Sequence, residues 1–81
     1  MDKTVETAIA NRILLYRKDR QLSQQTFAEQ CDISIRYLSQ IENGSANPTL
    51  SMMKALSAQL GTTVSQLTDT TQLPDSADGP P

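Results

Sequence analysis

The sequence predicts an all-α domain with five helices, and three observations support this prediction. Apolar residues recur every three or four positions along most of the chain, which is the spacing of one helix face. Serine or threonine, residues that cap helix N-termini, precedes several of these stretches. Glycine follows two of them, as is typical just past a helix C-terminus. With 81 residues, the chain forms one small domain at most.

The first helix is predicted over residues 5–20, a stretch without proline or glycine. Its apolar residues are separated by four, four and three positions: Val5, Ile9, Ile13 and Tyr16. This spacing favours one buried stripe along the helix. Leu22 and Ser23 then break the pattern.

The second helix is short and is predicted over residues 24–31. Ser23 can act as its N-cap, because its hydroxyl can accept from a free backbone amide of the first turn. Three side chains fall together on one face: Phe27, Ala28 and Cys31. Residues 32–34 then form a tight connection to the next helix.

The third helix is predicted over residues 35–43, with Ser34 accepting from its first amides. Gly44 ends it, since glycine is free to take a positive φ. Leu38 and Ile41 are three residues apart and suit one buried face. The outward residues are small, polar or forked, a kind of side chain that can contact the edges of bases: Ser34, Ile35, Arg36, Ser39 and Gln40.

The fourth helix follows a polar loop over residues 45–48, with Thr49 as its N-cap and Gly61 as its stop. Its buried face is predicted to consist of four residues: Leu50, Met53, Leu56 and Leu60. Met52 adjoins Met53, so both cannot face the same core. We expect Met52 to lie at the margin of this face, either as a partner contact or, as the simpler interpretation, as an exposed side chain.

The last helix is predicted over residues 64–70, and Thr63 with Gln66 has the spacing of a capping box. Val64 and Leu67 are its apolar residues. The sequence divides into a folded domain, residues 1–68, and a tail, residues 69–81. That tail holds three of the chain's four prolines and very few apolar side chains, so we expect it to be disordered.

Cysteine and histidine usage excludes several kinds of site. One cysteine cannot form an intrachain disulfide, and a zinc site would lack its usual ligands because histidine is absent. Cys31 is expected to be a small core residue rather than a nucleophile. Without a nucleophile–base pair or metal cluster we expect no enzyme, no metal and no cofactor. The N-terminus has no signal pattern and no run is long enough for a membrane helix, which predicts a cytoplasmic protein.

The net charge is unevenly distributed along the chain. The total of −2 argues at first sight against a nucleic-acid partner. However, residues 1–60 hold all seven basic and six acidic residues, a net charge of +1, while residues 61–81 hold three aspartates and no basic residue. The acidity therefore lies largely outside the predicted folded domain.

The second and third helices are joined by so few residues that they must cross steeply, which is the helix-turn-helix arrangement. Such a crossing needs a small residue where the helices meet, and Ala28 supplies it. Apolar residues fall where the corner must be locked: Phe27, Cys31, Ile33, Leu38 and Ile41. The complete set is much stronger evidence for a helix-turn-helix than any one of these residues.

On these residues the chain resembles the Cro/CI phage-repressor type of helix-turn-helix domain, also called the XRE type. The matching segments are LSQQTFAEQCDISIRYLSQIENGSANPTL, then MKALSAQLG and VSQL, so the likeness spans residues 9–67. The resemblance implies a compact, lambda-repressor-like bundle of five helices. It also implies that the third helix enters the major groove of DNA.

The resemblance implies two sets of DNA-binding residues. Those facing the bases are Ser34, Ile35, Arg36, Ser39 and Gln40, with Arg36 able to fork onto guanine and Gln40 onto adenine. Those expected at phosphates, which set register without reading sequence, are Gln24, Tyr37, Asn43, Ser45 and Asn47. The family also pairs an arginine late in the first helix with a glutamate late in the third, here Arg17 and Glu42, as a structural ion pair.

The chain departs from the family pattern in two places. The turn usually contains glycine, whereas this chain has Asp32, which tolerates left-handed backbone at some cost. The segment after Gly44 lacks the lysine or arginine often found there, so each subunit neutralises few phosphates. Because two subunits double the contact, we expect a homodimer, with the fifth helix at the partner contact and half-sites roughly 34 Å apart.

The function predicted from these features is a sequence-specific, DNA-binding transcriptional regulator, a repressor that occupies an operator. A signal would act through the dimer contact, the tail or a separate regulatory protein. The alternative is a protein-interaction module on the same scaffold, an antitoxin or a bridging coactivator, with the acidic tail as its contact segment. The small positive charge of the domain keeps this alternative open.

Overall fold

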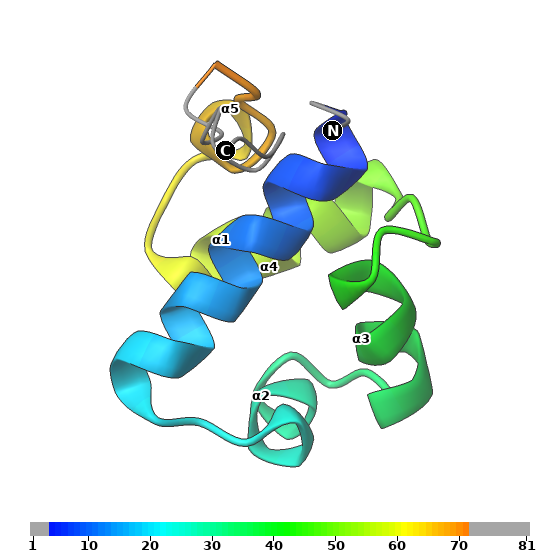
Figure 1. Cartoon of the computed structure of the whole chain (residues 1–81), viewed down its shortest axis with the longest axis vertical. Coiled ribbons are helices and arrows are strands. Elements are labelled where there is room, and N and C mark those ends of the chain that lie inside the picture. The colour runs from blue at the N-terminus through cyan, green and yellow to red at the C-terminus, as the bar shows by residue number, and fades with distance from the viewer. Residues whose placement is uncertain (1–3, 72–81) are drawn as a thin grey trace, which may run out of the picture.

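Hydroxyl side chains determine where the helices begin. The computed structural model describes residues 4–71, and within that range each helix is preceded by a serine or threonine whose side chain accepts from the backbone N–H three residues later: Thr4, Ser23, Ser34, Thr49 and Thr63. The helices that follow are α1 (Val5–Arg20), α2 (Gln24–Gln30), α3 (Ile35–Glu42), α4 (Leu50–Leu60) and α5 (Val64–Leu67) (Figure 1). At α5 the Gln66 side chain accepts in return from the Thr63 N–H, which completes the predicted capping box.

Left-handed residues end the first four helices. Their φ angles are 56° at Gln21, 58° at Asp32, 79° at Gly44 and 71° at Gly61. After each of them, the next N–H reaches a carbonyl five residues back, for example Ile33 N to Ala28 O at 3.0 Å. This geometry satisfies carbonyls that a helix end leaves without partners. Asp32 therefore adopts the conformation for which the family uses glycine, as expected, whereas nothing in the sequence indicated it for Gln21.

All five helices of the described range contribute to one hydrophobic core. Its fully buried members are Ile9, Ile13, Phe27, Ala28, Leu38, Ile41, Leu56 and Leu67. Cys31 and Ile33 are half-buried and pack against it, as the predicted corner requires. The Tyr16 ring meets the Phe27 ring edge to face, with 5.7 Å between centroids, so α1 and α2 are also joined through their aromatic side chains.

The packing of α2 against α3 forms the predicted helix-turn-helix corner. Figure 1 shows the two short helices meeting at an angle beside α1, with α5 at the other end of α1. Helix α1 contacts both α3 and α5, and α4 contacts α5. The long first helix thus connects the corner to the C-terminal part of the described chain. The all-α fold with five helices is confirmed over this range.

Three burial predictions were wrong. Val5 is 37% exposed and Leu50 is 59% exposed, because each is the first residue of its helix and lies at the edge of the buried stripe. Met52 is half-buried and packs against the core together with Met53. The buried side of α4 is thus centred on Leu56, about 120° around the helix from Leu50, a rotation that brings both methionines to its flanks.

The predicted ends of α2 and α3 were one residue too late, at Cys31 and Asn43, and that of α5 was three residues too late. At the end of α5 the Val64 carbonyl accepts from both the Thr68 N–H, at 3.0 Å, and the Thr68 hydroxyl, at 2.9 Å. Asp69 then accepts from the Thr71 N–H at 2.9 Å in a local turn. The prediction of disorder for residues 72–81 lies outside the described residues.

No helix between residues 4 and 71 is both long and apolar enough to cross a membrane.

Candidate nucleic-acid interface

The two faces of α3 differ in what they contact. Leu38 and Ile41 on its inner face are 0% and 1% exposed. Because Arg36, Ser39 and Gln40 lie on the opposite side of the helix, they point away from the core, whereas Ile35 lies on the flank, about 60° around the helix from Leu38. Three of these four are exposed and Ser39 is half-buried, so the predicted base-contacting residues form one continuous outer face with Ser34. The structure brings all five together.

Two side chains of this outer face are available for hydrogen bonding, and a third is partly committed. The Ser34 hydroxyl accepts from the Tyr37 N–H at 3.0 Å, so its oxygen already caps α3. By contrast, the Arg36 guanidinium and the Gln40 side-chain amide form no hydrogen bond to another residue within residues 4–71. The backbone carbonyl of Gln40 accepts from the Ser45 hydroxyl at 3.3 Å, which leaves the side chain free. Guanidinium and amide groups can each form paired bonds to a base edge.

An ion pair fixes the orientation of α3. Arg17 Nη1 donates to both carboxylate oxygens of Glu42, at 2.9 and 2.8 Å, and Arg17 Nε donates to the Leu22 carbonyl at 3.2 Å. The side chains are only 19% and 8% exposed, so the pair is shielded from water. Arg17 therefore links the last turn of α1 to the end of α3 and to the α1–α2 connection.

Gln24, one of the residues expected at a phosphate, also contacts this ion pair. Its side-chain Nε2 donates to Glu42 Oε1 at 3.0 Å, an interaction that the sequence did not indicate. An amide nitrogen has two N–H groups, so one donor remains for a phosphate. Gln24 is the first residue of α2, where backbone amides and the helix dipole also favour an anion.

The other predicted phosphate contacts lie on α3 and after it. Tyr37 is half-buried and packs against the core, while Asn43, Ser45 and Asn47 are exposed. Asn43 Oδ1 accepts from the Ser45 N–H at 2.9 Å and from its hydroxyl at 2.5 Å. These bonds hold the turn after α3 and leave the Asn43 NH₂ group facing solvent.

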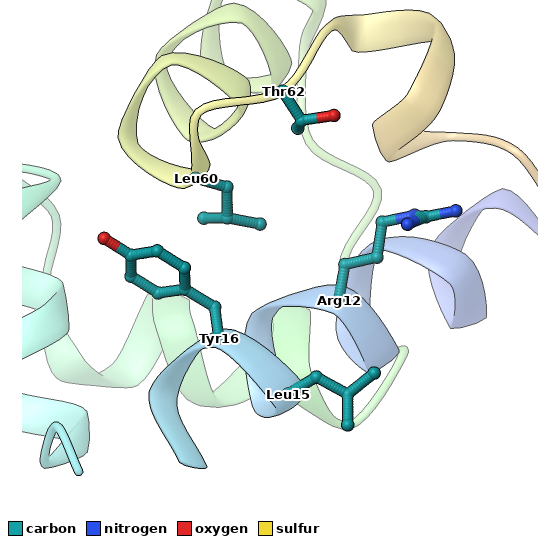
Figure 2. A pocket seen from close by; sticks show the side chains of 5 residues that line it. All are labelled: Arg12, Leu15, Tyr16, Leu60 and Thr62. Carbon is teal, nitrogen blue, oxygen red and sulfur yellow. The ribbon is translucent and has the colours of Figure 1, made fainter. Parts of the chain in front are cut away.

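A pocket occupies a different part of the surface. Figure 2 shows its lining side chains, which come from α1, from the end of α4 and from the connection to α5: Arg12, Leu15, Tyr16, Leu60 and Thr62. Arg12 Nε is buried there without a hydrogen-bond partner in the described range. Sequence reasoning missed this pocket. The one sequence feature that could have indicated it is Arg12, a charged residue next to the predicted buried stripe of Ile9, Ile13 and Tyr16. None of the predicted DNA-binding residues lines it.

Cys31 has the character of a packing residue. Burial raises the pKa of its thiol, so less of it is present as the reactive thiolate. In the part of the chain that the structure describes, no three side chains of the metal-ligating types gather in one place. The thiol is thus suited to filling space beside Phe27 and Ile33.

Known helix-turn-helix proteins are similar in sequence to most of this chain. Residues 13–67 match the helix-turn-helix family model HTH_3. The chain is 39% identical over 64 residues to the control protein C.MunI of Mycoplasma sp., covering 78% of this chain and 86% of that protein. It is also 39% identical over 59 residues to the immunity repressor protein of Bacillus phage phi105, covering 73% of this chain but 41% of that longer protein.

A solved structure has the same arrangement of helices. It is the crystal structure of the hypothetical transcription factor NHTF from Neisseria, with a TM-score of 0.75 and 28% sequence identity. The match covers 96% of this chain and 86% of that one. The likeness thus extends over nearly the whole of both chains rather than over the helix-turn-helix corner alone.

Proposed function

Because the chain belongs to the helix-turn-helix family HTH_3, we propose that it is a DNA-binding transcriptional repressor that inserts α3 into the major groove of an operator. The observation that supports this most directly is the outer face of α3. It presents Ile35, Arg36 and Gln40 to solvent while the ion pair of Arg17 and Glu42 fixes the helix from behind. A fixed helix loses little conformational freedom when it binds.

The base-contacting residues in this proposal are Ser34, Ile35, Arg36, Ser39 and Gln40. Arg36 binds guanine through its two parallel N–H groups, and Gln40 binds adenine through its amide. Gln24, Tyr37, Asn43, Ser45 and Asn47 bind the sugar–phosphate backbone and set the register. Of the residues in the two sets only Arg36 is charged, so a single subunit releases few counterions and binds weakly.

A homodimer compensates for this weak binding by occupying two half-sites about one helical turn apart. We place the partner contact at α5, whose outer residues Ser65 and Gln66 are exposed while Leu67 belongs to the core. Sedimentation of the full chain across micromolar concentrations measures its mass directly. A monomer at concentrations that saturate an operator would overturn the dimer but leave the DNA-binding proposal intact.

The DNA-binding proposal is tested by selecting duplexes from random sequence with the full chain, then titrating the selected site and its single-base variants. Arg36→Ala is expected to lose about 1–3 kcal/mol at one base position and to relax specificity there. Gln24→Ala is expected to weaken every duplex by the same factor, because its partner is a phosphate.

Lys54→Ala provides the matched control, because Lys54 is an exposed cation on α4 rather than α3. It tests whether the loss of any positive charge is enough to lower the affinity for DNA. The assignment of roles is overturned if Arg36→Ala and Gln24→Ala give identical profiles across the panel. Absence of binding to any duplex at low salt would instead favour the protein-interaction alternative.

A further inference from the structure

We propose that Ile35 makes the operator thymine-specific at one position of each half-site, by packing against the thymine C5-methyl group. The proposal rests on the DNA-binding function above. It concerns an apolar side chain that neither the core nor a hydrogen bond accounts for.

Ile35 is one of the large apolar residues that the described structure leaves exposed. Its side chain is 44% exposed, while the next apolar residues of the helix, Leu38 and Ile41, are buried. Its helix propensity is also slightly lower than that of leucine or alanine, because β-branched residues lose rotamer freedom in a helix. Single exposed apolar residues are common in proteins, so exposure alone indicates no partner. Its place on α3 adds the decisive information.

Ile35 is the first residue of α3, immediately after the cap Ser34. In a helix-turn-helix protein the N-terminal residues of the recognition helix reach base edges most deeply. Ser39 lies one turn further along the same side, and Arg36 and Gln40 lie next to them on the side away from the core. Ile35 is thus the one large apolar side chain on a face whose other members are polar.

The chemistry of the major groove leaves one match for such a side chain. Thymine presents its C5-methyl there, whereas cytosine presents an N4 amino group, and purines present N7 with O6 or N6. Isoleucine has no donor or acceptor, so it would cover the cytosine amino group without replacing its water hydrogen bond. Against thymine it covers only apolar surface. The preference is therefore for thymine and depends on a single methyl group.

The test uses the full chain and a duplex obtained by selection. Each thymine is replaced in turn by deoxyuridine, which removes only the methyl group, and affinity is measured by fluorescence anisotropy for wild type and Ile35→Ala. At one thymine per half-site the wild type is expected to weaken about three- to fivefold, as for loss of one buried methyl-sized contact. Ile35→Ala is expected to show no further loss at that position.

Two further measurements isolate the methyl group and the residue. With cytosine at the sensitive position, 5-methylcytosine should bind wild type better than cytosine by a similar factor. Leu50→Ala is the matched control, because Leu50 is likewise exposed and is also the first residue of a helix capped by a hydroxyl. It should retain the full sensitivity to deoxyuridine.

The outcomes separate this inference from the function on which it rests. If the chain selects duplexes but no thymine is sensitive, or if Ile35→Ala is as sensitive as wild type at every thymine, the role of Ile35 is overturned and the DNA-binding function stands. If selection enriches no duplex, both are overturned.

Discussion

On the inner face of α3, Leu38 and Ile41 are almost completely buried, whereas on the outer face Ile35, Arg36 and Gln40 are exposed. Leu38 and Ile41 pack against other helices of the same chain. No other helix covers the outer-face residues enough to bury them. The comparison shows how a helix of eight residues can support the fold through one face and leave the other face free for the proposed DNA contacts. Substitutions on the inner face should change the free energy of unfolding, and those on the outer face should change DNA binding alone.

The largest effect is expected on the inner face. Leu38→Ala should lower the free energy of unfolding by about 2–5 kcal/mol, because it removes a fully buried side chain and leaves a cavity. A small domain has only about 5–15 kcal/mol in total, so this variant should be close to unfolding. Urea denaturation followed by circular dichroism measures the loss. Unchanged stability would contradict the central position of Leu38 in the core.

The second largest effect on stability is expected at the ion pair of Arg17 and Glu42. Glu42→Gln should cost about 2–3 kcal/mol, somewhat below the ~3–5 kcal/mol of a fully buried pair, because Arg17 retains some access to water. The matched control is Glu29→Gln on α2, whose exposed side chain should give a change within about 0.5 kcal/mol.

A double variant distinguishes two causes of the lost stability: the missing attraction between Arg17 and Glu42, and the cost of leaving the Arg17 guanidinium without a partner. Replacing both Arg17 and Glu42 by methionine should restore stability toward that of wild type, because the cost of Glu42→Gln arises mainly from the unpaired guanidinium. If the double variant is as unstable as the sum of both single variants, the charges themselves stabilise the corner.

The corner between the two helices should show a smaller effect. Asp32 has a φ of 58°, so Asp32→Val should cost about 1–2 kcal/mol while Asp32→Gly should cost nothing. The same thermal or urea unfolding series measures both. Equal stabilities for valine and glycine would mean that the turn can adopt another conformation.

The smallest effect on stability is expected on the outer face. Gln40→Ala should change the free energy of unfolding by no more than about 0.5 kcal/mol, because its side chain is exposed and alanine favours helix. Binding to the selected operator should nevertheless fall, most strongly at one adenine. A large loss of stability would show that the outer face also supports the fold.

The helix boundaries were largely predictable because their causes are local. A hydroxyl three residues before an N–H, or a glycine after the last turn, acts within a few positions of the sequence. Ser23, Ser34, Thr49 and Thr63 all cap helices as expected. Gln21 ends α1 without any such signal, because the chain must turn there for Leu22 to reach the Arg17 carbonyl.

The candidate site was predictable in part. Helical spacing placed Ile35, Arg36 and Gln40 on one outward face, and the structure has them there. The contact of Gln24 with Glu42 was not predictable, since it joins residues 18 positions apart that only the folded corner brings together. The base and phosphate contacts themselves stay predictions until DNA is bound.

The number and order of the helices, their caps and the short connection between α2 and α3 follow from the sequence, because they depend on neighbouring residues. The burial of Val5, Leu50 and Met52 and the hydrogen bond from Gln24 to Glu42 instead follow from how the helices pack. Burial depends on how far each helix is rotated toward its partners, and a stripe of apolar residues fixes that rotation only to within the width of the stripe.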